Sequence, residues 1–287
     1  MTDPKFSIVI PTLNRPLMVL EAIASALAQT ESDLEVIVVD NYPAGPMTTT
    51  ISDSRLRIIR NPEMVSACDN WNIGLNQVKG EFVSFLCDDD VFLPDFLRQT
   101  YELLQRDSNC RLVTTPWHYV DSQLEIIQTA SSLGWKFFPI LTAKQFVLDV
   151  LDCRRALTLD STLCRTEDLR RVGGFKPAGF SSPWCVDHYA LYRVALLGTV
   201  VRTTVDPLLR YRLHSENISC ELTVNQCDRL VREMDNYFDT LSDVREAFDY
   251  LAFDNAFSNY RDFFVRLLDR STEPKNQTQI RAIEDQP

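Results

Sequence analysis

Several features that mark whole classes of protein are missing from this chain of 287 residues. No stretch approaches the ~18 uninterrupted apolar residues that a membrane-spanning helix needs. The amino terminus lacks a charged segment followed by an apolar one, which is the pattern of a secretory signal. The eight cysteines form no CxxC pair and no spacing typical of zinc ligands. We therefore expect a cytoplasmic protein whose thiols are reduced and mostly buried.

Positive charge is also scarce, since the formal net charge is -11 and the pI is near 4.8. This balance argues against broad nucleic-acid binding and against a basic membrane-binding patch. No internal repeat and no low-complexity block is visible. A hydrophobic content of 45% is enough for a substantial core. The length then suits one large domain, or one domain with an appended helical piece.

What the chain does contain is an alternation of strand and helix patterns over residues 1–118. Apolar runs predict strands at residues 6–11, 34–40, 56–60, 82–86 and 111–117. Helical spacing predicts helices at residues 16–29, 67–78 and 94–106. This alternation implies a Rossmann-like α/β fold, with a mainly parallel sheet between two layers of helices.

The patterns after residue 118 are more varied. We expect an irregular aromatic segment at 119–141, and strands at 157–164 and 205–213. Helices are predicted at 142–151, at 166–172 with Thr166 as its N-cap, and at 187–197. Residues 223–268 read as two amphipathic helices, and 271–287 as a flexible tail.

Three consecutive aspartates, Asp88, Asp89 and Asp90, end the fourth predicted strand. Like charges at a strand end repel one another unless water, backbone donors or a cation compensates them. In an open α/β sheet, ligands bind at the carboxyl ends of the strands. Carboxylate oxygens there suit Mg²⁺ or Mn²⁺, usually together with a phosphate-bearing ligand. An isolated acidic run is more simply explained as a solvent-exposed loop. The choice between a metal site and such a loop therefore depends on the other motifs of the chain.

Several short segments accompany the acidic run in an order that supports a specific interpretation. They are residues 7–15, 34–41, 72–74, 80–94, 173–175, 186–193 and 209–214. Their joint order and spacing, across roughly residues 5–218, resemble glycosyltransferase family 2, whose members have the GT-A fold. The resemblance implies a metal-dependent, inverting transfer of sugar from a nucleotide-diphosphate sugar, with Mn²⁺ or Mg²⁺ as cofactor. UDP-sugar is favoured by family tendency.

The resemblance assigns the nucleotide to the ends of the first two strands. Backbone groups around Pro11, Thr12 and Asn14 would meet the nucleotide, and Arg15 would contact phosphate. Asp40 would accept a hydrogen bond from the base, although an aspartate after a strand also commonly forms a turn.

The metal is assigned to the acidic run. Asp89 is the expected direct ligand, Asp90 would ligate or orient, and Asp88 would lie near the ribose or the metal's waters. His214 would complete the metal or diphosphate site, whereas a lone histidine is more often structural. Cys87 stands where the family commonly has the first acid.

The resemblance also provides the catalytic base. Asp187 begins a predicted helix, so the positive end of the helix dipole favours its carboxylate, although it could serve only as an N-cap. In the family role it takes a proton from the acceptor hydroxyl, which attacks the anomeric carbon. Val186 stands where the family often has another acid.

The remaining candidates for binding the nucleotide sugar each have a structural alternative. They are Asn72, Gly174, Trp184, Arg210 and Arg212. Trp184 could stack on a sugar ring or pack in the core. The two arginines share a face by strand periodicity, so they could neutralise diphosphate or cover the sheet.

These assignments divide the chain into a catalytic domain at 1–222, C-terminal helices at 223–270 and a tail at 271–287. Within the first, residues 1–118 would bind the nucleotide and 119–222 the acceptor. The acceptor would be a growing surface polysaccharide, a lipid-linked oligosaccharide or a protein glycan, with any membrane acceptor met peripherally at the inner face. The C-terminal helices could instead support membrane contact or a homodimer.

Two alternatives remain open at this point. A sugar nucleotidyltransferase would also need an α/β sheet and Mg²⁺, but it should carry a glycine-rich loop after the first strand. No glycine stands in residues 11–15. A catalytically inactive GT-A module that binds carbohydrate or protein is kept open by Asn41, Cys87 and Val186.

Overall fold

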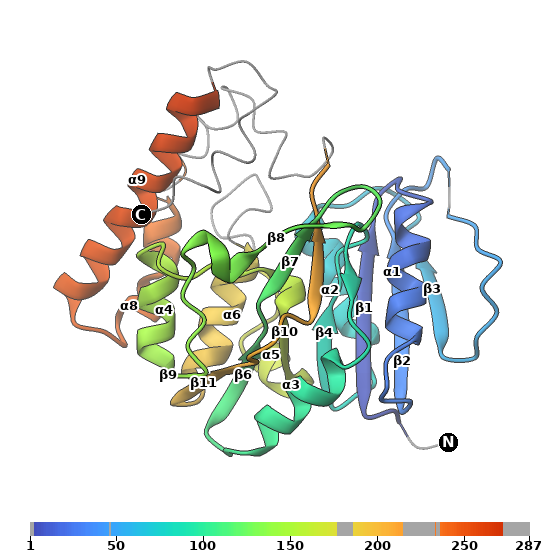
Figure 1. Cartoon of the computed structure of the whole chain (residues 1–287), viewed down its shortest axis with the longest axis horizontal. Helices are drawn as coiled ribbons and strands as arrows, with labels where there is room; N and C mark the ends of the chain where they lie inside the picture. The colour runs from blue at the N-terminus through green and yellow to red at the C-terminus, as the bar shows by residue number, and fades with distance from the viewer. Residues whose placement is uncertain (1–2, 46, 177–185, 215–232, 234–235, 272–287) are drawn as a thin grey trace.

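The computed structural model describes residues 3–45, 47–176, 186–214, 233 and 236–271 (Figure 1). Its centre is an eight-stranded sheet in the order β3-β2-β1-β4-β10-β6-β11-β9. These strands are β1 (Phe6–Thr12), β2 (Leu34–Asp40), β3 (Leu56–Arg60), β4 (Phe82–Phe85), β6 (Cys110–Thr114), β9 (Ile140–Thr142), β10 (Thr162–Arg165) and β11 (Val200–Thr203). The strands predicted within residues 1–86 therefore agree with the structure to within one residue at each end.

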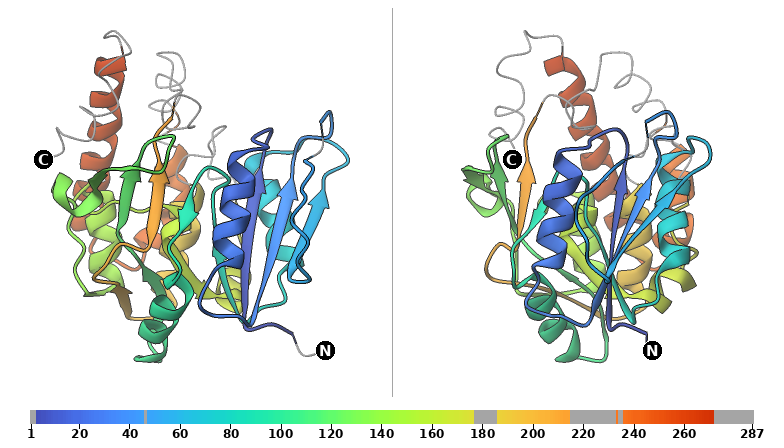
Figure 2. Two further views of the ribbon diagram at one scale, coloured as in Figure 1. Left: turned by 45° about the vertical axis from the view of Figure 1, so that its right-hand side comes forward. Right: turned by 90° about the vertical axis from the view of Figure 1, so that its right-hand side faces the viewer.

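Helices cover both faces of this sheet (Figure 2). On one face α1 (Met18–Leu27) and α3 (Phe96–Gln105) share a core with alternate residues of β1 and β2, such as Ile8 and Val36. On the other face α2 (Ala67–Gln77), α4 (Ala143–Leu151) and α6 (Val186–Leu196) pack against the intervening residues, such as Val9 and Ile37. Both faces are buried, so the strands are apolar almost throughout. The expected three-layer arrangement is confirmed.

The expectation of a mainly parallel sheet is confirmed, because every strand of it except β10 and β9 runs in the same direction. Strands β3, β2, β1 and β4 are parallel to their neighbours. Strand β10 then runs antiparallel to both β4 and β6, and β9 antiparallel to β11, while β11 is parallel to β6. Sequence periodicity predicts that a segment is a strand but contains no signal for its direction. The antiparallel β10 brings the preceding segment, residues 159–161, beside the end of β4.

A second, four-stranded sheet has the order β5-β12-β7-β8. Its strands are β5 (Val91–Phe92), β7 (Trp117–Val120), β8 (Ile126–Thr129) and β12 (Leu209–Arg212). Residues 119–141 were expected to be irregular, but they contain β8, the 3₁₀ helix η1 (Ala130–Leu133) and parts of β7 and β9. The expectation was wrong because strands of three or four residues, partly exposed, are too short to show a period. Strand β5 directly follows Asp90, so this sheet joins the acidic run to β12.

Several helix boundaries also differ from the predictions. In helix α5 (Thr166–Arg171) the N-cap position is Arg165, whose side chain makes no capping hydrogen bond. Thr166 is the first helical residue, and its hydroxyl donates to the carbonyl oxygen of Gly80 at 2.7 Å. Of the two helices predicted over residues 223–268, the described residues contain helix at 236–240, α8 (Ser242–Arg245) and the 22-residue α9 (Tyr250–Ser271), while residues 223–232 lie outside the described residues. Phe253 and Phe257 of α9 are buried in the core that includes α4 and α6. The expected tail after residue 271 lies outside the described residues.

In the described ranges, no helix is both long enough and apolar enough to traverse a bilayer.

Replacing Gly80 with alanine is expected to destabilise the fold, because the new Cβ atom would lie 2.6 Å from the backbone of Phe6 and Ser7 in β1. Backbone of a central strand cannot move away cheaply, so Gly80→Ala should lower the free energy of unfolding by about 1–3 kcal/mol. Urea denaturation measures this difference. Lys79→Ala, at the exposed neighbouring position, is the control and should change stability by less than about 0.5 kcal/mol. Equal stability of the two variants would contradict the close packing described here.

Candidate active site

The first aspartate of the acidic run fastens the end of β1 to the end of β4. Asp88 accepts hydrogen bonds at Oδ2 from Thr12 Oγ1 at 2.7 Å and from the Leu13 amide at 3.3 Å. Its Oδ1 accepts from Arg15 Nη1 at 2.8 Å. Burial and the neighbouring charge of Asp89 raise the pKa of Asp88, while Arg15 and Thr12 act in the opposite direction. Asp88 therefore fixes the loop that the sequence assigns to the nucleotide.

The second aspartate is the meeting point of three segments that are far apart in the sequence. Asp89 Oδ2 lies 2.9 Å from Arg15 Nη1 and 3.1 Å from His214 Nε2. The side chains of Asp89 and His214 are only 9% and 8% exposed. The structure thus brings together three residues that the sequence assigns to metal and phosphate binding. It does so where the parallel strands β1 and β4 end.

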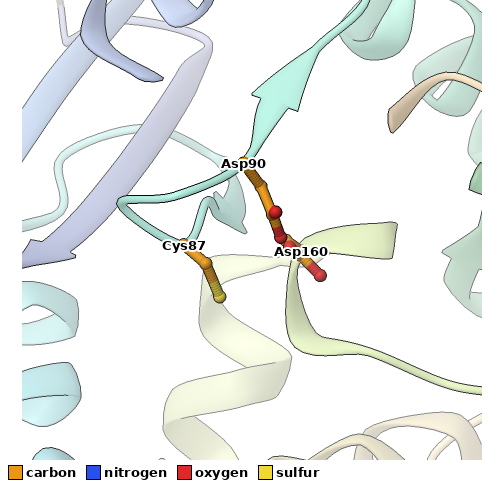
Figure 3. Close-up of side chains that lie close together, drawn as sticks. All are labelled: Cys87, Asp90 and Asp160. Carbon is orange, nitrogen blue, oxygen red and sulfur yellow. The ribbon is translucent and has the colours of Figure 1, made fainter. Parts of the chain in front are cut away.

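The third aspartate faces away from this group, toward Asp160 (Figure 3). Asp90 Oδ1 accepts a hydrogen bond from the Arg212 amide at 2.8 Å, and one oxygen of Asp90 lies within 4.8 Å of one oxygen of Asp160. Burial, followed by the charge of Asp160, raises the pKa of Asp90 well above its ordinary value. Burial also raises the pKa of Asp160 to about 6, with further contributions from the charges of Asp89 and Asp187. Burial beside another carboxyl therefore favours the protonated form of Asp90.

Cys87 completes this second cluster. Its sulfur and one oxygen from each of Asp90 and Asp160 lie within 4.8 Å of one another. Burial, and then the surrounding carboxylates, raise the pKa of the Cys87 thiol well above its ordinary value. The cluster thus faces the interior of the domain, whereas Asp89 faces two basic side chains.

Asp160 is the site residue that sequence reasoning missed. It lies in the 3₁₀ helix η2 (Leu159–Ser161), immediately before β10, and it is completely buried. No motif surrounds it, and the sequence pattern predicted this region only as part of a strand. A completely buried aspartate is unusual, but its burial becomes visible only once β10 is placed between β4 and β6.

Arg212 is held by several partners. Its Nε donates to the carbonyl oxygen of Asp89 at 2.8 Å and its Nη1 to that of Ser122 at 3.1 Å, and the guanidinium also pairs with Glu21. It is 3% exposed. Of the two roles that the sequence leaves open, covering and bracing the sheet fits these contacts better than binding diphosphate. Arg210 is half-buried, opposite Val91.

Asp40 is buried at the end of β2, and its carboxylate accepts hydrogen bonds from the loop that follows. Its Oδ1 accepts from the Tyr42 amide at 3.1 Å and its Oδ2 from the Met47 amide at 2.7 Å. These contacts match the turn-forming alternative, while hydrogen bonding to a base stays a prediction. The next residue, Asn41, accepts from Asn61 Nδ2 at 2.9 Å, and Asn61 donates to Asn70 as well, at 2.8 Å.

Asn72 and Gly174, two of the candidates for binding the nucleotide sugar, lie against each other. The Asn72 amide donates to the Phe175 carbonyl oxygen at 2.6 Å and accepts from the Phe175 amide at 3.0 Å. Gly174 has φ +64, and a Cβ atom there would lie 2.5 Å from Asn72 Oδ1. The pair therefore fixes the Gly-Gly-Phe turn against α2. Trp184 lies outside the described residues.

The candidates at the ends of the site are placed as follows. Pro11 is half-buried within β1, and Asn14 is exposed with a left-handed backbone, φ 56. Asp187 is half-buried in the first turn of α6, where the helix dipole favours a negative charge. Its charge influences Asp160, so the proposed base lies on the same side of the molecule as the acidic run.

Comparison with known proteins identifies the family. The profile described as "Glycosyl transferase family 2" matches residues 7–198, which is more than half of the chain. The chain belongs to glycosyltransferase family 2.

An uncharacterized glycosyltransferase of Haemophilus influenzae is 30% identical over 129 residues, covering 42% of this chain and 44% of that protein. The GalNAc(5)-diNAcBac-PP-undecaprenol beta-1,3-glucosyltransferase of Campylobacter jejuni is 36% identical over 96 residues, or 31% of each chain. These matches thus span less than half of either relative.

Solved structures show the same fold. TarS 1-349 of S. aureus in complex with UDP-GlcNAc has a TM-score of 0.65 at 14% identity, covering 97% of this chain and 79% of that one. Mannosyltransferase PcManGT from Pyrobaculum calidifontis, in complex with GDP-Man and Mn2+, has a TM-score of 0.55 at 16% identity, covering 98% and 79%. The expected GT-A fold is thereby confirmed.

Replacing Asp160 with asparagine is expected to stabilise the protein at neutral pH. An acid whose pKa is raised by folding destabilises the fold once pH exceeds its unfolded value, so the penalty grows from about pH 4 to about pH 6. At pH 7.5 the free energy of unfolding of Asp160→Asn should therefore exceed that of the wild type by on the order of 1–3 kcal/mol. At pH 4.5 the difference should be much smaller.

Urea denaturation at the two pH values measures the effect. Asp33→Asn, at an exposed aspartate, is the matched control and should show no such dependence. A loss of stability in Asp160→Asn that is equal at both pH values would contradict the raised pKa of Asp160.

Proposed function

We propose that this chain is a metal-dependent, inverting glycosyltransferase that moves a sugar from a nucleotide-diphosphate sugar to a glycan, lipid-linked or protein-linked acceptor. The observation that carries the proposal is the convergence of Arg15 and His214 on Asp89 Oδ2, in a chain of this family. It supports a site for a cation and phosphate at the carboxyl ends of β1 and β4, where open α/β sheets bind ligands.

The residues present fit a divalent cation. A carboxylate oxygen and an imidazole nitrogen 3.1 Å apart are a donor pair that Mn²⁺ accepts readily and Mg²⁺ can use. Asp89 and His214 would hold the ion, which when bound would offset negative charge on the diphosphate leaving group. Asp90 would orient this site rather than ligate, because its side chain accepts from the Arg212 amide and is turned toward Asp160 (Figure 3). Arg15 adds a positive charge beside the same phosphates.

The donor in this proposal is a UDP-sugar, on family tendency. The two neighbouring structures contain UDP-GlcNAc and GDP-Man, so a guanine nucleotide is the first alternative to test. For the acceptor, the printed name of the Campylobacter relative describes a lipid-linked glycan, and an Escherichia coli relative, 32% identical over 100 residues, is named a putative colanic acid biosynthesis glycosyl transferase. Both names favour an acceptor in surface-polysaccharide or lipid-linked glycan synthesis.

The base in this proposal is Asp187. Its carboxylate, at the positive end of α6, would take the proton from the acceptor hydroxyl while that oxygen attacks the anomeric carbon. The bond to the diphosphate breaks in the same displacement, so the anomeric configuration is inverted. Thr12, Asp88 and Arg15 hold the phosphate end of the donor site in place during this step.

Replacing Asp89 with alanine tests the donor site. Calorimetric titration of the wild type with UDP and with GDP should show binding of one of them that requires Mn²⁺ and disappears in EDTA. Asp89→Ala should lose this metal-dependent binding, because it removes the charged ligand between Arg15 and His214. Asp33→Ala, at an exposed aspartate outside the site, should bind as the wild type does. Unchanged Mn²⁺-dependent binding by folded Asp89→Ala would place the metal elsewhere.

Replacing Asp187 with asparagine separates chemistry from binding. Donor affinity should stay nearly constant, whereas turnover should fall by about 10²-fold or more, as expected when a general base is lost. Turnover is measured as nucleotide release from the donor sugar that binds, with Asp33→Asn as the control. Wild-type turnover by Asp187→Asn would show that another group takes the proton.

A further inference from the structure

His188, the residue after the proposed base, is bound at both ring nitrogens. Its Nε2 lies 2.9 Å from the carbonyl oxygen of Leu157, and its Nδ1 lies 3.1 Å from the hydroxyl of Tyr260 in α9. These partners are 31 and 72 residues away along the chain. The first turn of α6 is therefore connected both to the segment leading to Asp160 and to the C-terminal helix.

The direction of each hydrogen bond follows from the chemistry of the groups. A carbonyl oxygen can only accept, so Nε2 of His188 carries the proton that is donated to Leu157. In a neutral imidazole, Nδ1 then has only a lone pair, so the Tyr260 hydroxyl donates to it. The arrangement fixes both the tautomer and the orientation of the ring.

Tyr260 is itself firmly placed. It is 4% exposed, and its ring lies 6.5 Å from that of Tyr237 and 6.4 Å from that of Phe257. The rings of His188 and Tyr260 are 6.3 Å apart. A buried tyrosine hydroxyl on a well-packed helix is a rigid donor, because its aromatic body has little freedom to move.

A second connection joins the same helix to α8. Tyr189 Oη donates to Asp243 Oδ1 at 3.3 Å, and Arg193 Nε lies 2.9 Å from Asp243 Oδ2. The two residues that follow Asp187 are thus both anchored to the C-terminal helices, one to α9 and one to α8. The side chain of Asp187 projects from the backbone that these anchors hold.

We propose that Tyr260 and His188 are positioning residues, through which the C-terminal helix α9 holds the carboxylate of Asp187 in its catalytic position. The inference rests on the proposed function, in which Asp187 is the base. It gives the C-terminal helices a part in the reaction itself, beyond packing on the domain. Because a displacement of about 1 Å in a catalytic group can cost about 10²-fold in rate, loss of one anchor should be measurable in turnover.

The test compares full-length Tyr260→Phe with Tyr250→Phe, a control at an exposed position of the same helix. Nucleotide release is followed with UDP-N-acetylglucosamine and with GDP-mannose, and the melting temperature of each variant is recorded. Tyr260→Phe should lower kcat by about ten-fold while the KM for the donor stays constant. Wild-type kcat, or a fall in kcat matched by a rise in KM and a loss of melting temperature, would overturn the proposal.

A spectroscopic measurement reports on the hydrogen bond without relying on turnover. The chain has three histidines, His118, His188 and His214, so ¹⁵N-histidine labelling gives few signals, and His188→Asn assigns the relevant pair. His188 should show the tautomer protonated at Nε2, and its Nδ1 signal should shift in Tyr260→Phe while the signals of the other two stay in place. A tautomer protonated at Nδ1 would overturn the proposal.

Asp187→Asn, measured in parallel, distinguishes the two possible failures. If Asp187→Asn turns over at the wild-type rate, the assignment of the base is wrong, whatever Tyr260→Phe does. If Asp187→Asn is slow and Tyr260→Phe has wild-type kcat, the base stands and only the positioning role of α9 is rejected.

Discussion

The structure of this site depends on one constraint, which is the repulsion among three consecutive aspartates at the buried end of β4. Counted over backbone and side chain together, Asp88, Asp89 and Asp90 are each at most 6% exposed. Solvent therefore screens their charges little. Each of the three side chains has different neighbours. Asp88 is hydrogen-bonded to the end of β1, Asp89 faces Arg15 and His214, and Asp90 accepts from the Arg212 amide and faces Asp160 (Figure 3).

These different surroundings give three chemically equivalent side chains three different properties. A carboxylate that already receives donors from Thr12, Leu13 and Arg15 acts as a structural clamp. Asp90 is turned toward a second buried carboxyl, Asp160, and accepts from the Arg212 amide, so it faces the interior of the domain (Figure 3). Asp89 is left as the carboxylate that combines negative charge with an imidazole neighbour. The proposal that Asp89 holds the metal is therefore supported by its surroundings as well as by its position in the acidic run.

The sequence was sufficient to predict strands β1, β2, β3 and β4, because strands buried on both faces are continuous apolar runs with clear ends. It was also sufficient to name Arg15, Asp89 and His214, because each stands in a segment that resembles the family. It could not predict that Asp160 lies beside the acidic run or that Tyr260 contacts His188, since neither residue lies in a motif. Their contacts arise from the antiparallel placement of β10 and from the docking of α9, which depend on tertiary packing rather than on local pattern. The short strands β7 and β8 were missed for want of a visible period.

The central claim is that Asp89 and His214 together form the metal end of a nucleotide-sugar site. The most direct measurement is a crystal structure of the protein with Mn²⁺ and the nucleotide that it binds, using anomalous scattering at the manganese edge. The account predicts one strong anomalous peak, bonded to Asp89 and His214 and to phosphate oxygens. A manganese peak bonded instead to Asp90 and Asp160, or a bound nucleotide distant from Asp89, would contradict it.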